Sequence, residues 1–359
     1  MGKKKVKILL LTIVLKNMFQ IFEDIGICYL ASYLRREGHD VLLLEKDEED
    51  IDFDSIFDFK PEFIGVSIYD VSKDAVFRTI EKIKSKMPEV VICLGGYTPT
   101  FNGVKLMQEN KNVDYVIKGE GEKVYTQFIQ KVLSNEKLND VEGLIYRDEG
   151  QIINNPPQSK LLDINTLPWP ARDLLFQNQL NTAVMSTSRG CLGECTFCVS
   201  KSFWKKWRGR SVPDVVDEIE YIIDKYKKKN FFFADCSFED PGPPYNRLKE
   251  FTDTVIRRHL DISYIAYFRA EFHRFADHEL MQALKKSGLC GALIGIESAD
   301  NHDLILYNKI ATSEDNIKII RLFESYNINP TIGFMMFNPY STFESLHNNI
   351  EYGWISLES

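Results

Sequence analysis

Three cysteines, Cys191, Cys195 and Cys198, lie within one eight-residue segment with the spacing Cys-x3-Cys-x2-Cys. A tight loop with this spacing brings three thiolates onto one concave face, where they can grip a single metal centre. A zinc site usually takes four protein ligands in pairs, so this loop fits zinc poorly. A [4Fe-4S] cluster held at three irons, with the fourth iron open, fits better. A structural metal knuckle and three unrelated cysteines remain the alternatives.

The cysteine spacing, with the aromatic Phe197 directly before the last cysteine, resembles the radical S-adenosylmethionine (radical SAM) enzymes. In that family the open iron binds the amino and carboxylate groups of SAM, and an electron from the cluster cleaves SAM to a 5′-deoxyadenosyl radical. The resemblance implies that the three cysteines are the metal ligands and catalytic residues. It also implies a [4Fe-4S] cluster and SAM as cofactors.

The elements that must position this loop are alternating strands and helices. Short apolar runs predict strands at 182–187, 230–235, 263–269, 291–298 and 330–337. The pattern predicts helices between them, and the repeated unit predicts a partial (β/α) barrel whose function gathers at the carboxyl ends of its strands. The radical SAM core usually has six such units, so the five counted here predict a barrel that lacks the sixth strand. Truncation and a short variant closed by a partner are the two explanations.

Several polar residues stand at the ends of these predicted strands. SAM carries a carboxylate, an ammonium, a sulfonium and ribose hydroxyls, so it needs both an arginine and carboxylates nearby. By resemblance, Arg269, Glu297 and Ser298 contact the methionyl and ribose parts of SAM, and the backbone of Phe197 meets the adenine. For Arg269 and Glu297, a surface salt bridge is the alternative interpretation.

The segment after the second strand departs from the family pattern. Asp235, Ser237 and Phe238 occupy the place of a SAM-binding motif, but the Gly-Gly-Glu of many relatives is missing. The resemblance assigns Asp235 and Ser237 to the cofactor site. We expect Cys236 and Cys290 to be small buried hydrophobic residues rather than further ligands.

The first half of the chain shows the same alternation. Apolar runs predict strands at 7–14, 41–44, 63–68, 90–96 and 114–117. Helical spacing follows at 26–37 and 74–86, so the sequence predicts a doubly wound, Rossmann-like α/β domain. Ligands of such domains bind at the carboxyl ends of the strands.

The loops at those ends, 15–21, 67–74, 95–100 and 118–122, include paired glycines and a Gly-Glu-Gly-Glu segment. Together they resemble the cobalamin (B12)-binding domain that precedes the catalytic domain in a large class of radical SAM enzymes. The implied cofactor-binding residues are Ser67, Asp70, Gly95, Gly96, Tyr97, Gly119, Glu120, Gly121 and Glu122. The Asp-x-His-x-x-Gly signature is absent, and His39 precedes the second strand, at the wrong end of the sheet. The resemblance is thus to the type that binds cobalamin without a histidine ligand, and a domain that has lost its cofactor is the alternative.

The sequence predicts three regions. They are a cobalamin-binding domain at 1–140, a hairpin with a proline-rich linker at 141–178, and the partial barrel at 179–359. Prolines fix the path of such a linker at low entropic cost.

Composition excludes several classes of protein. The formal charge of −8 argues against a nucleic-acid surface, and we expect the basic segment 201–210 to be a solvated loop. The apolar run 8–15 is too short for a signal peptide or a membrane span. Seven cysteines, an odd number with three close together, indicate a reducing cytoplasm rather than a disulfide framework.

The sequence therefore predicts a cobalamin-dependent radical SAM enzyme that methylates an unactivated carbon of a small-molecule or peptide substrate. Its reductant would be a flavodoxin or ferredoxin, with no nucleic-acid or membrane partner. A radical SAM enzyme without functional cobalamin binding and a truncated, non-catalytic iron–sulfur protein are the alternatives.

Overall fold

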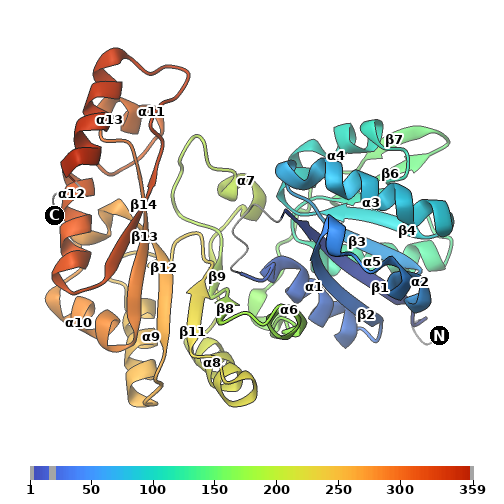
Figure 1. Ribbon diagram of the computed structural model, residues 1–359, viewed down its shortest axis with the longest axis horizontal. Coiled ribbons are helices and arrows are strands. Elements are labelled where there is room, and N and C mark those ends of the chain that lie inside the picture. The colour runs from blue at the N-terminus through green and yellow to red at the C-terminus, as the bar shows by residue number, and fades with distance from the viewer. Residues whose placement is uncertain (1–3, 16–21, 356–359) are drawn as a thin grey trace. The chain divides into compact units, whose positions relative to one another are not determined.

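The computed structural model describes residues 4–15 and 22–355 of the chain, which divides into two compact units (Figure 1). The first unit is Met1–Leu180 and the second is Asn181–Ser359. Each unit contains one main sheet, and the two sheets are described separately below.

The first unit is built on a seven-stranded sheet with the order β2-β1-β3-β4-β5-β6-β7. Five strands are parallel, with β6 and β7 antiparallel at one edge. The strands are β1 (Lys7–Val14), β2 (Asp40–Asp47), β3 (Phe63–Ser67), β4 (Val91–Gly95), β5 (Tyr115–Ile117), β6 (Leu144–Asp148) and β7 (Gln151–Asn154). Strand β1, which lies between β2 and β3, is buried on both faces, as its unbroken apolar run predicts.

Helices cover both faces of this sheet, which confirms the doubly wound prediction (Figure 1). The helices are α1 (Ile25–Arg36), α2 (Phe53–Phe59), α3 (Lys73–Lys86), α4 (Tyr97–Glu109), α5 (Gly121–Leu133) and the short α6 (Asp173–Gln177). Alternate residues of β1 serve the two sides: Ile8 and Leu10 share a core with α1 and α5, whereas Leu9 and Leu11 share one with α2, α3 and α4.

The hairpin predicted within the linker belongs to the first sheet. Strand β6 pairs antiparallel with β5, from Tyr115 opposite Tyr146 to Ile117 opposite Leu144. Strand β5 is only three residues long and would form the edge of the sheet without β6. By pairing with β5, β6 extends the sheet and buries its own apolar side. The proline-rich segment that follows is tied to α1 by an ion pair between Asp173 and Arg35, with an O···N distance of 2.6 Å. The boundary after residue 140 stays a prediction.

The second unit is built on a five-stranded parallel sheet with the order β14-β13-β12-β11-β8. Its strands are β8 (Thr182–Met185), β11 (Asn230–Phe233), β12 (Ser263–Arg269), β13 (Leu289–Glu297) and β14 (Asn329–Phe334). A small separate ribbon pairs β9 (Ser188–Arg189) with β10 (Arg208–Gly209). All five predicted strands are present, and among the described residues the sheet has no sixth strand. The curl of this sheet into a partial barrel stays a prediction.

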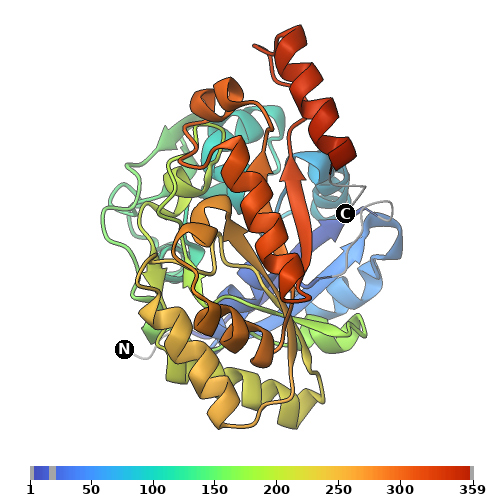
Figure 2. The same cartoon turned by 90° about the vertical axis from the view of Figure 1, so that its left-hand side faces the viewer.

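Helices alternate with the strands of the second sheet (Figure 2). They are α7 (Ser200–Trp204), α8 (Val212–Tyr226), α9 (Asn246–Arg257), α10 (His278–Lys286), α11 (Asn301–Leu306), α12 (Ser313–Ser325) and α13 (Phe343–Ile355). Four single 3-10 turns complete the elements, at Glu48–Asp50, Asp70–Ser72, Ile164–Thr166 and Ala270–Arg274. None of the described helices is long and apolar enough to cross a membrane.

Aromatic side chains form much of the core of the second unit. Phe238 stacks on Phe233 with ring centroids 5.0 Å apart, and both rings also contact Phe251 and Tyr264. Phe238 is 1% exposed, so it anchors the segment after β11 in the core and its ring does not serve the site.

Candidate functional site

A cavity of about 540 Å³ lies within the second unit, at the carboxyl ends of β11, β12 and β13. Its size is in the range of small-molecule sites. The residues predicted from the sequence that line it are Cys191, Cys195, Phe197, Cys198, Asp235, Arg269 and Glu297. The structure therefore brings the cysteine loop and three of the predicted polar residues to one hollow.

The cysteine loop is closed at its base by the β9–β10 ribbon, in which Arg208 pairs with Arg189. Gly190 follows this ribbon with a φ of +88°, a conformation that favours glycine. A Cβ atom at this position would lie 2.5 Å from the carbonyl oxygen of Lys206. The close approach of the two ends of the loop thus requires glycine directly before the first cysteine.

The far side of the loop is held by the C-terminal end of α11. The side-chain amide of Asn308 donates to the carbonyl of Glu194 at 2.9 Å, and the backbone N–H of Thr196 donates to the carbonyl of Tyr307 at 3.0 Å. The rings of Phe197 and Tyr307 meet edge to face, with centroids 5.5 Å apart. These contacts position a segment that has little secondary structure of its own.

Cys191 and Cys195 are half-buried, whereas Cys198 is exposed. The backbone N–H of Gly193 donates to Sγ of Cys191 at 3.2 Å. Burial raises the pKa of Cys191 to about 12, although this hydrogen bond opposes the shift, and burial also raises the pKa of Cys195. A metal centre bound here must therefore displace protons from both sulfurs, as thiolate ligands require.

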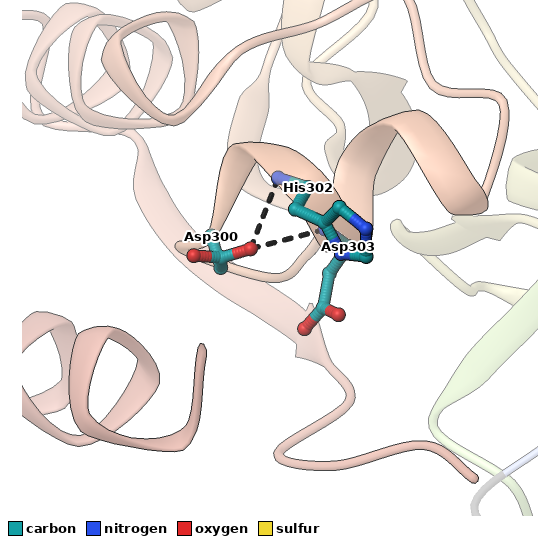
Figure 3. A group of neighbouring side chains, drawn as sticks. All are labelled: Asp300, His302 and Asp303. Atoms are coloured by element: carbon teal, nitrogen blue, oxygen red, sulfur yellow. Dashed lines mark hydrogen bonds between the residues drawn. The ribbon is translucent and has the colours of Figure 1, made fainter. Parts of the chain in front are cut away.

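Among the described residues, one group of three potential metal-ligand atoms lies within 4.8 Å of one another, at Asp300, His302 and Asp303. This group is a helix cap (Figure 3). The carboxylate of Asp300 accepts hydrogen bonds from the backbone N–H groups of His302 and Asp303 at the start of α11, at 3.0 and 3.1 Å. The carboxylate of Asp303 in turn accepts from the side-chain amide of Asn338 and the hydroxyl of Ser298. The acidic oxygens are thus used to begin a short helix.

Ser298 does not line the cavity. It is 0% exposed, and its hydroxyl lies 3.1 Å from Asp303 and 2.9 Å from the side-chain oxygen of Asn349. Ser298 directly follows the last residue of β13, Glu297, and its hydroxyl is engaged by Asp303 and Asn349 away from the cavity lining. The prediction that Ser298 contacts SAM therefore gains no support from its position.

Arg269 lines the cavity but is surrounded by acids. Its Nε lies 3.0 Å from Glu239, its Nη2 lies 2.8 Å from Asp240, and its Nη1 lies 3.6 Å from Glu271. Burial alone would lower the pKa of Arg269, but the carboxylates of Glu239 and Asp240 outweigh it, so the pKa lies above its usual value. This guanidinium is already committed to three carboxylates, and neither a free anion receptor nor the predicted surface salt bridge describes it.

One of these acids, Asp240, also contacts the cysteine loop. Glu239 and Asp240 have fully buried side chains, and burial raises the pKa of each while Arg269 opposes the shift. The carboxylate of Asp240 accepts a hydrogen bond of 3.1 Å from the backbone N–H of Leu192, next to the first cysteine. Neither Glu239 nor Asp240 was predicted from the sequence, although an adjacent Glu-Asp pair after a buried strand was a visible signal.

Asp235 and Ser237 have positioning contacts. The carboxylate of Asp235 accepts hydrogen bonds from the backbone N–H of Thr187 at 3.2 Å, from its hydroxyl at 3.0 Å and from the hydroxyl of Ser188. Asp235 therefore fixes the chain that enters the cysteine loop from β8. Ser237 is 0% exposed and lies outside the cavity lining.

Glu297 reaches the cavity because the end of β13 is irregular. The register between β13 and β14 shifts between Gly295 and Glu297, and Glu297 has a φ of +68°. Such a bulge redirects a side chain, and a left-handed conformation is strained for a residue with a Cβ atom. Burial raises the pKa of Glu297, opposed by Lys309, whose Nζ lies 4.0 Å from its Oε1. The sequence analysis missed Lys309, since no pattern marks a single lysine in a loop.

Two expectations about cysteines are wrong. Cys236 was expected to be buried but is half-buried and lines the cavity, with its Sγ 3.6 Å from the hydroxyl of Ser200. Cys290 is exposed, because alternate residues of β13 face away from the core. The basic segment also differs from a solvated loop: Arg210 is 5% exposed and pairs with Glu218 at 2.6 Å.

In the first unit, Ser67 ends β3, and Gly95 ends β4 at the same edge of the sheet. Gly96 has a φ of +104°, and a Cβ atom there would meet nothing closer than 3.6 Å. Tyr97 is the first residue of α4, and Asp70 begins a 3-10 turn after β3. A Cβ atom at Gly95 would meet nothing within 4 Å, and this open space fits a bulky ligand that approaches the backbone.

The Gly-Glu-Gly-Glu segment divides between two roles. Gly119, with a φ of +75°, ends the loop after β5 and donates its N–H to the hydroxyl of Thr100 at 2.9 Å. Gly121 begins α5, whereas Glu120 and Glu122 line a separate cavity of about 320 Å³ with residues of 140–162. Gly95 and Gly96 do not line that cavity, so the structure does not bring these two acids together with the paired glycines there.

Two further details of the first unit concern the predicted cobalamin site. His39 directly precedes β2, which runs parallel to β1, so it lies at the amino end of the strands as expected. Of the predicted loop 15–21, residues 16–21 lie outside the described part of the chain.

Comparison with known families agrees with this division of the chain. The family model of the B12 binding domain matches residues 11–129, and that of the radical SAM superfamily matches residues 185–352.

Curated relatives match across most of the chain. An uncharacterized methyltransferase of Pyrococcus horikoshii is 28% identical over 339 residues, which are 91% of this chain and 72% of the relative. The anaerobic magnesium-protoporphyrin IX monomethyl ester cyclase of Rubrivivax gelatinosus is 27% identical over 318 residues, 84% of this chain and 56% of the relative.

A solved structure also matches. It is that of OxsB, a cobalamin-dependent S-adenosylmethionine radical enzyme with aqua-cobalamin and S-adenosylmethionine bound. The TM-score is 0.85 and the identity 25%, covering 97% of this chain and 52% of OxsB. This chain thus spans from about half to about three quarters of the length of these proteins.

Proposed function

The chain belongs to the radical SAM enzymes that carry a B12 binding domain, and we propose that it cleaves SAM reductively to a 5′-deoxyadenosyl radical and, with cobalamin, transfers a methyl group to an unactivated carbon. The observation that carries the proposal is the placement of Cys191, Cys195 and Cys198 in one cavity with acidic and basic side chains. That combination suits a metal centre and a ligand that bears both signs of charge.

The three cysteines are the proposed ligands of a [4Fe-4S] cluster. When bound, the cluster supplies the electron that cleaves SAM. The protein contributes a preformed loop, held by Asn308 and Tyr307 on one side and by the carboxylate of Asp240 on the other. Phe197 lines this cavity, is 43% exposed and offers an apolar surface next to the last cysteine, which suits the adenine.

The proposed cobalamin site is the carboxyl edge of the first sheet, at Ser67, Asp70, Gly95, Gly96, Tyr97 and Gly119. A Cβ atom at Gly95 would meet nothing within 4 Å, so open space lies beside the backbone there. His39 is at the opposite end of β2, so the proposed mode of binding uses no ligand from it. When bound, cobalamin supplies the methyl group.

The substrate is a small molecule or a peptide, and the reductant is a flavodoxin or ferredoxin. A methyltransferase and a cyclase are both among the relatives, so methyl transfer is the proposed outcome and ring formation is the competing one.

Product analysis tests the proposal directly. The anaerobically reconstituted protein is reduced with dithionite and incubated with SAM, and 5′-deoxyadenosine and methionine are quantified with and without cobalamin. Formation of both products supports radical SAM chemistry, and their absence from a protein that holds its cluster would contradict it. Cleavage by a protein that cannot retain cobalamin would support the radical SAM assignment and contradict the role of cobalamin.

A further inference from the structure

Two cationic side chains line the cavity beside the cysteine loop, and they differ in how many of their N–H donors already have partners. Arg269 meets three carboxylates within 3.6 Å. Lys309 makes a single hydrogen bond, from its Nζ to the carbonyl of Gly295 at 3.0 Å, and its nearest carboxylate oxygen is 4.0 Å away on Glu297. A lysine ammonium has three N–H donors, so two remain for a ligand.

The position of Lys309 is built into the fold. Its side chain is only 7% exposed, and it lines the cavity with Cys195 and Glu297. A Cβ atom at Gly295 would lie 3.5 Å from its Nζ and 2.7 Å from the Oε1 of Glu297. Glycine at this position, followed by the bulge at Glu297, thus makes the space in which the lysine and the glutamate face one another.

The ammonium lines the same cavity as Cys191, Cys195 and Cys198. A buried cation with two free donors, in one cavity with the proposed cluster ligands, is a receptor for an anionic group that binds next to the metal centre.

We infer that Lys309, and not Arg269, binds the carboxylate of SAM. This assignment rests on the proposed function and replaces the role that the sequence analysis gave to Arg269. Glu239, Asp240 and Glu271 leave the guanidinium of Arg269 in an environment with excess negative charge, which repels a carboxylate. Lys309 faces a single carboxylate at a longer distance and keeps its donors for the ligand.

The alternative role for Lys309 is structural, as the counter-ion that holds Glu297 in place. The two roles predict different results for a pair of ligands, SAM and decarboxylated SAM, which keeps the ammonium, the sulfonium and the nucleoside. If the role is structural, replacing Lys309 lowers the affinity for both ligands equally. If Lys309 binds the carboxylate, the replacement lowers the affinity for SAM alone.

The test is equilibrium binding of both ligands to the protein reconstituted with its cluster, measured by calorimetry without reductant. Lys309→Met should lower the affinity for SAM by about 10- to 100-fold, the range for a hydrogen bond to a charged group. The affinity for decarboxylated SAM should fall far less. Lys309→Arg should retain the preference of the wild type. Any other contact of the carboxylate is common to all variants, so the change in the ratio of the two affinities isolates Lys309.

Two control variants complete the design. Lys318→Met removes an exposed lysine paired with Glu314 and should leave both affinities unchanged. Arg269→Lys keeps the charge at the competing position and should leave the ratio unchanged. If Lys309→Met lost its cluster, Lys309→Gln and the ratio of the wild type itself would still decide the matter.

Several outcomes would overturn the inference. They are a wild type without preference for SAM, an equal loss of both ligands in Lys309→Met or Lys309→Gln, and a preference that Arg269→Lys abolishes. Failure of the cluster-loaded wild type to bind either ligand would instead contradict the proposed function.

Discussion

The carboxyl edges of the two sheets present different chemistry. In the second unit, thiols, acids and two cations meet in a cavity of about 540 Å³. In the first unit, the comparable edge at Gly95 and Gly96 is made of glycine backbone, with open space beside Gly95. Reactive side chains at a sheet edge indicate which cofactor can bind there, whereas glycines show only that there is space for a cofactor. The function of the second edge can therefore be argued from its residues, and that of the first relies on similarity.

Replacement of one cluster ligand should have the largest effect and should separate the two edges. We expect Cys195→Ala to abolish the iron–sulfur absorbance and the cleavage of SAM together, because Cys191 and Cys198 alone cannot hold a three-cysteine cluster. Retention of cobalamin on gel filtration should be unchanged. Cys290→Ala, at an exposed cysteine outside the cavity, is the matched control. Cleavage of SAM at the rate of the wild type would contradict the assignment of the cysteine loop.

Removal of the charge of Arg269 tests whether the second edge depends on its buried ion pairs. Arg269→Gln leaves Glu239 and Asp240 buried without their partner, so we expect a loss of about 3–5 kcal/mol in the free energy of unfolding. Denaturant unfolding measures the loss. Arg258→Gln, which breaks half-exposed pairs with Asp217 and Glu220, should cost about 1 kcal/mol or less. Equal losses in the two variants would remove the special role of Arg269.

A methyl group at the first edge tests whether cobalamin approaches the glycine backbone there. We expect Gly96→Ala to weaken retention of cobalamin by about tenfold, the equivalent of about 1.4 kcal/mol, with no change in the cluster. Gly150→Ala is the matched control, since Gly150 has a similar positive φ of +81° in the β6–β7 turn, with nothing within 4 Å of the added Cβ. Equal retention of cobalamin by both variants would show that cobalamin does not bind at this edge of the sheet.

A methyl group at the second edge should have a smaller and more specific effect. Gly295→Ala brings a Cβ atom to 2.7 Å from the Oε1 of Glu297, so Glu297 and Lys309 must shift. We expect the affinity for SAM to fall several-fold, and at most about tenfold, while the cluster spectrum stays unchanged. Gly291→Ala lies on the same strand outside the cavity, and calorimetry should show no loss of affinity there. An unchanged affinity of Gly295→Ala for SAM would show that Glu297 and Lys309 do not contact the ligand.

Much of the fold could be predicted from the sequence. The apolar runs of β1 and β12 and the helical spacing of α8 each mark an element that is buried in a regular way. The hairpin β6–β7 was placed with the linker because its pairing with the short β5 depends on a distant part of the chain. Long-range pairing leaves no local pattern.

The site was predictable only in part, for the same reason. The spacing of Cys191, Cys195 and Cys198 marks them directly. Whether Glu297 or Ser298 enters the cavity depends on a bulge at the end of β13, which the sequence does not reveal. The role of Lys309 depends on the return of the loop after α11 to Gly295, and the occupation of Arg269 depends on acids about thirty residues earlier in the chain.

The most direct test is anaerobic reconstitution with iron, sulfide and hydroxocobalamin, followed by electron paramagnetic resonance of the reduced protein with and without SAM. The account predicts a reduced-cluster signal that changes when SAM is added, from a protein that retains cobalamin through gel filtration. A cluster signal without retained cobalamin would contradict the assignment of the first edge. The absence of any cluster signal would contradict the central claim that the three cysteines hold a metal centre for SAM.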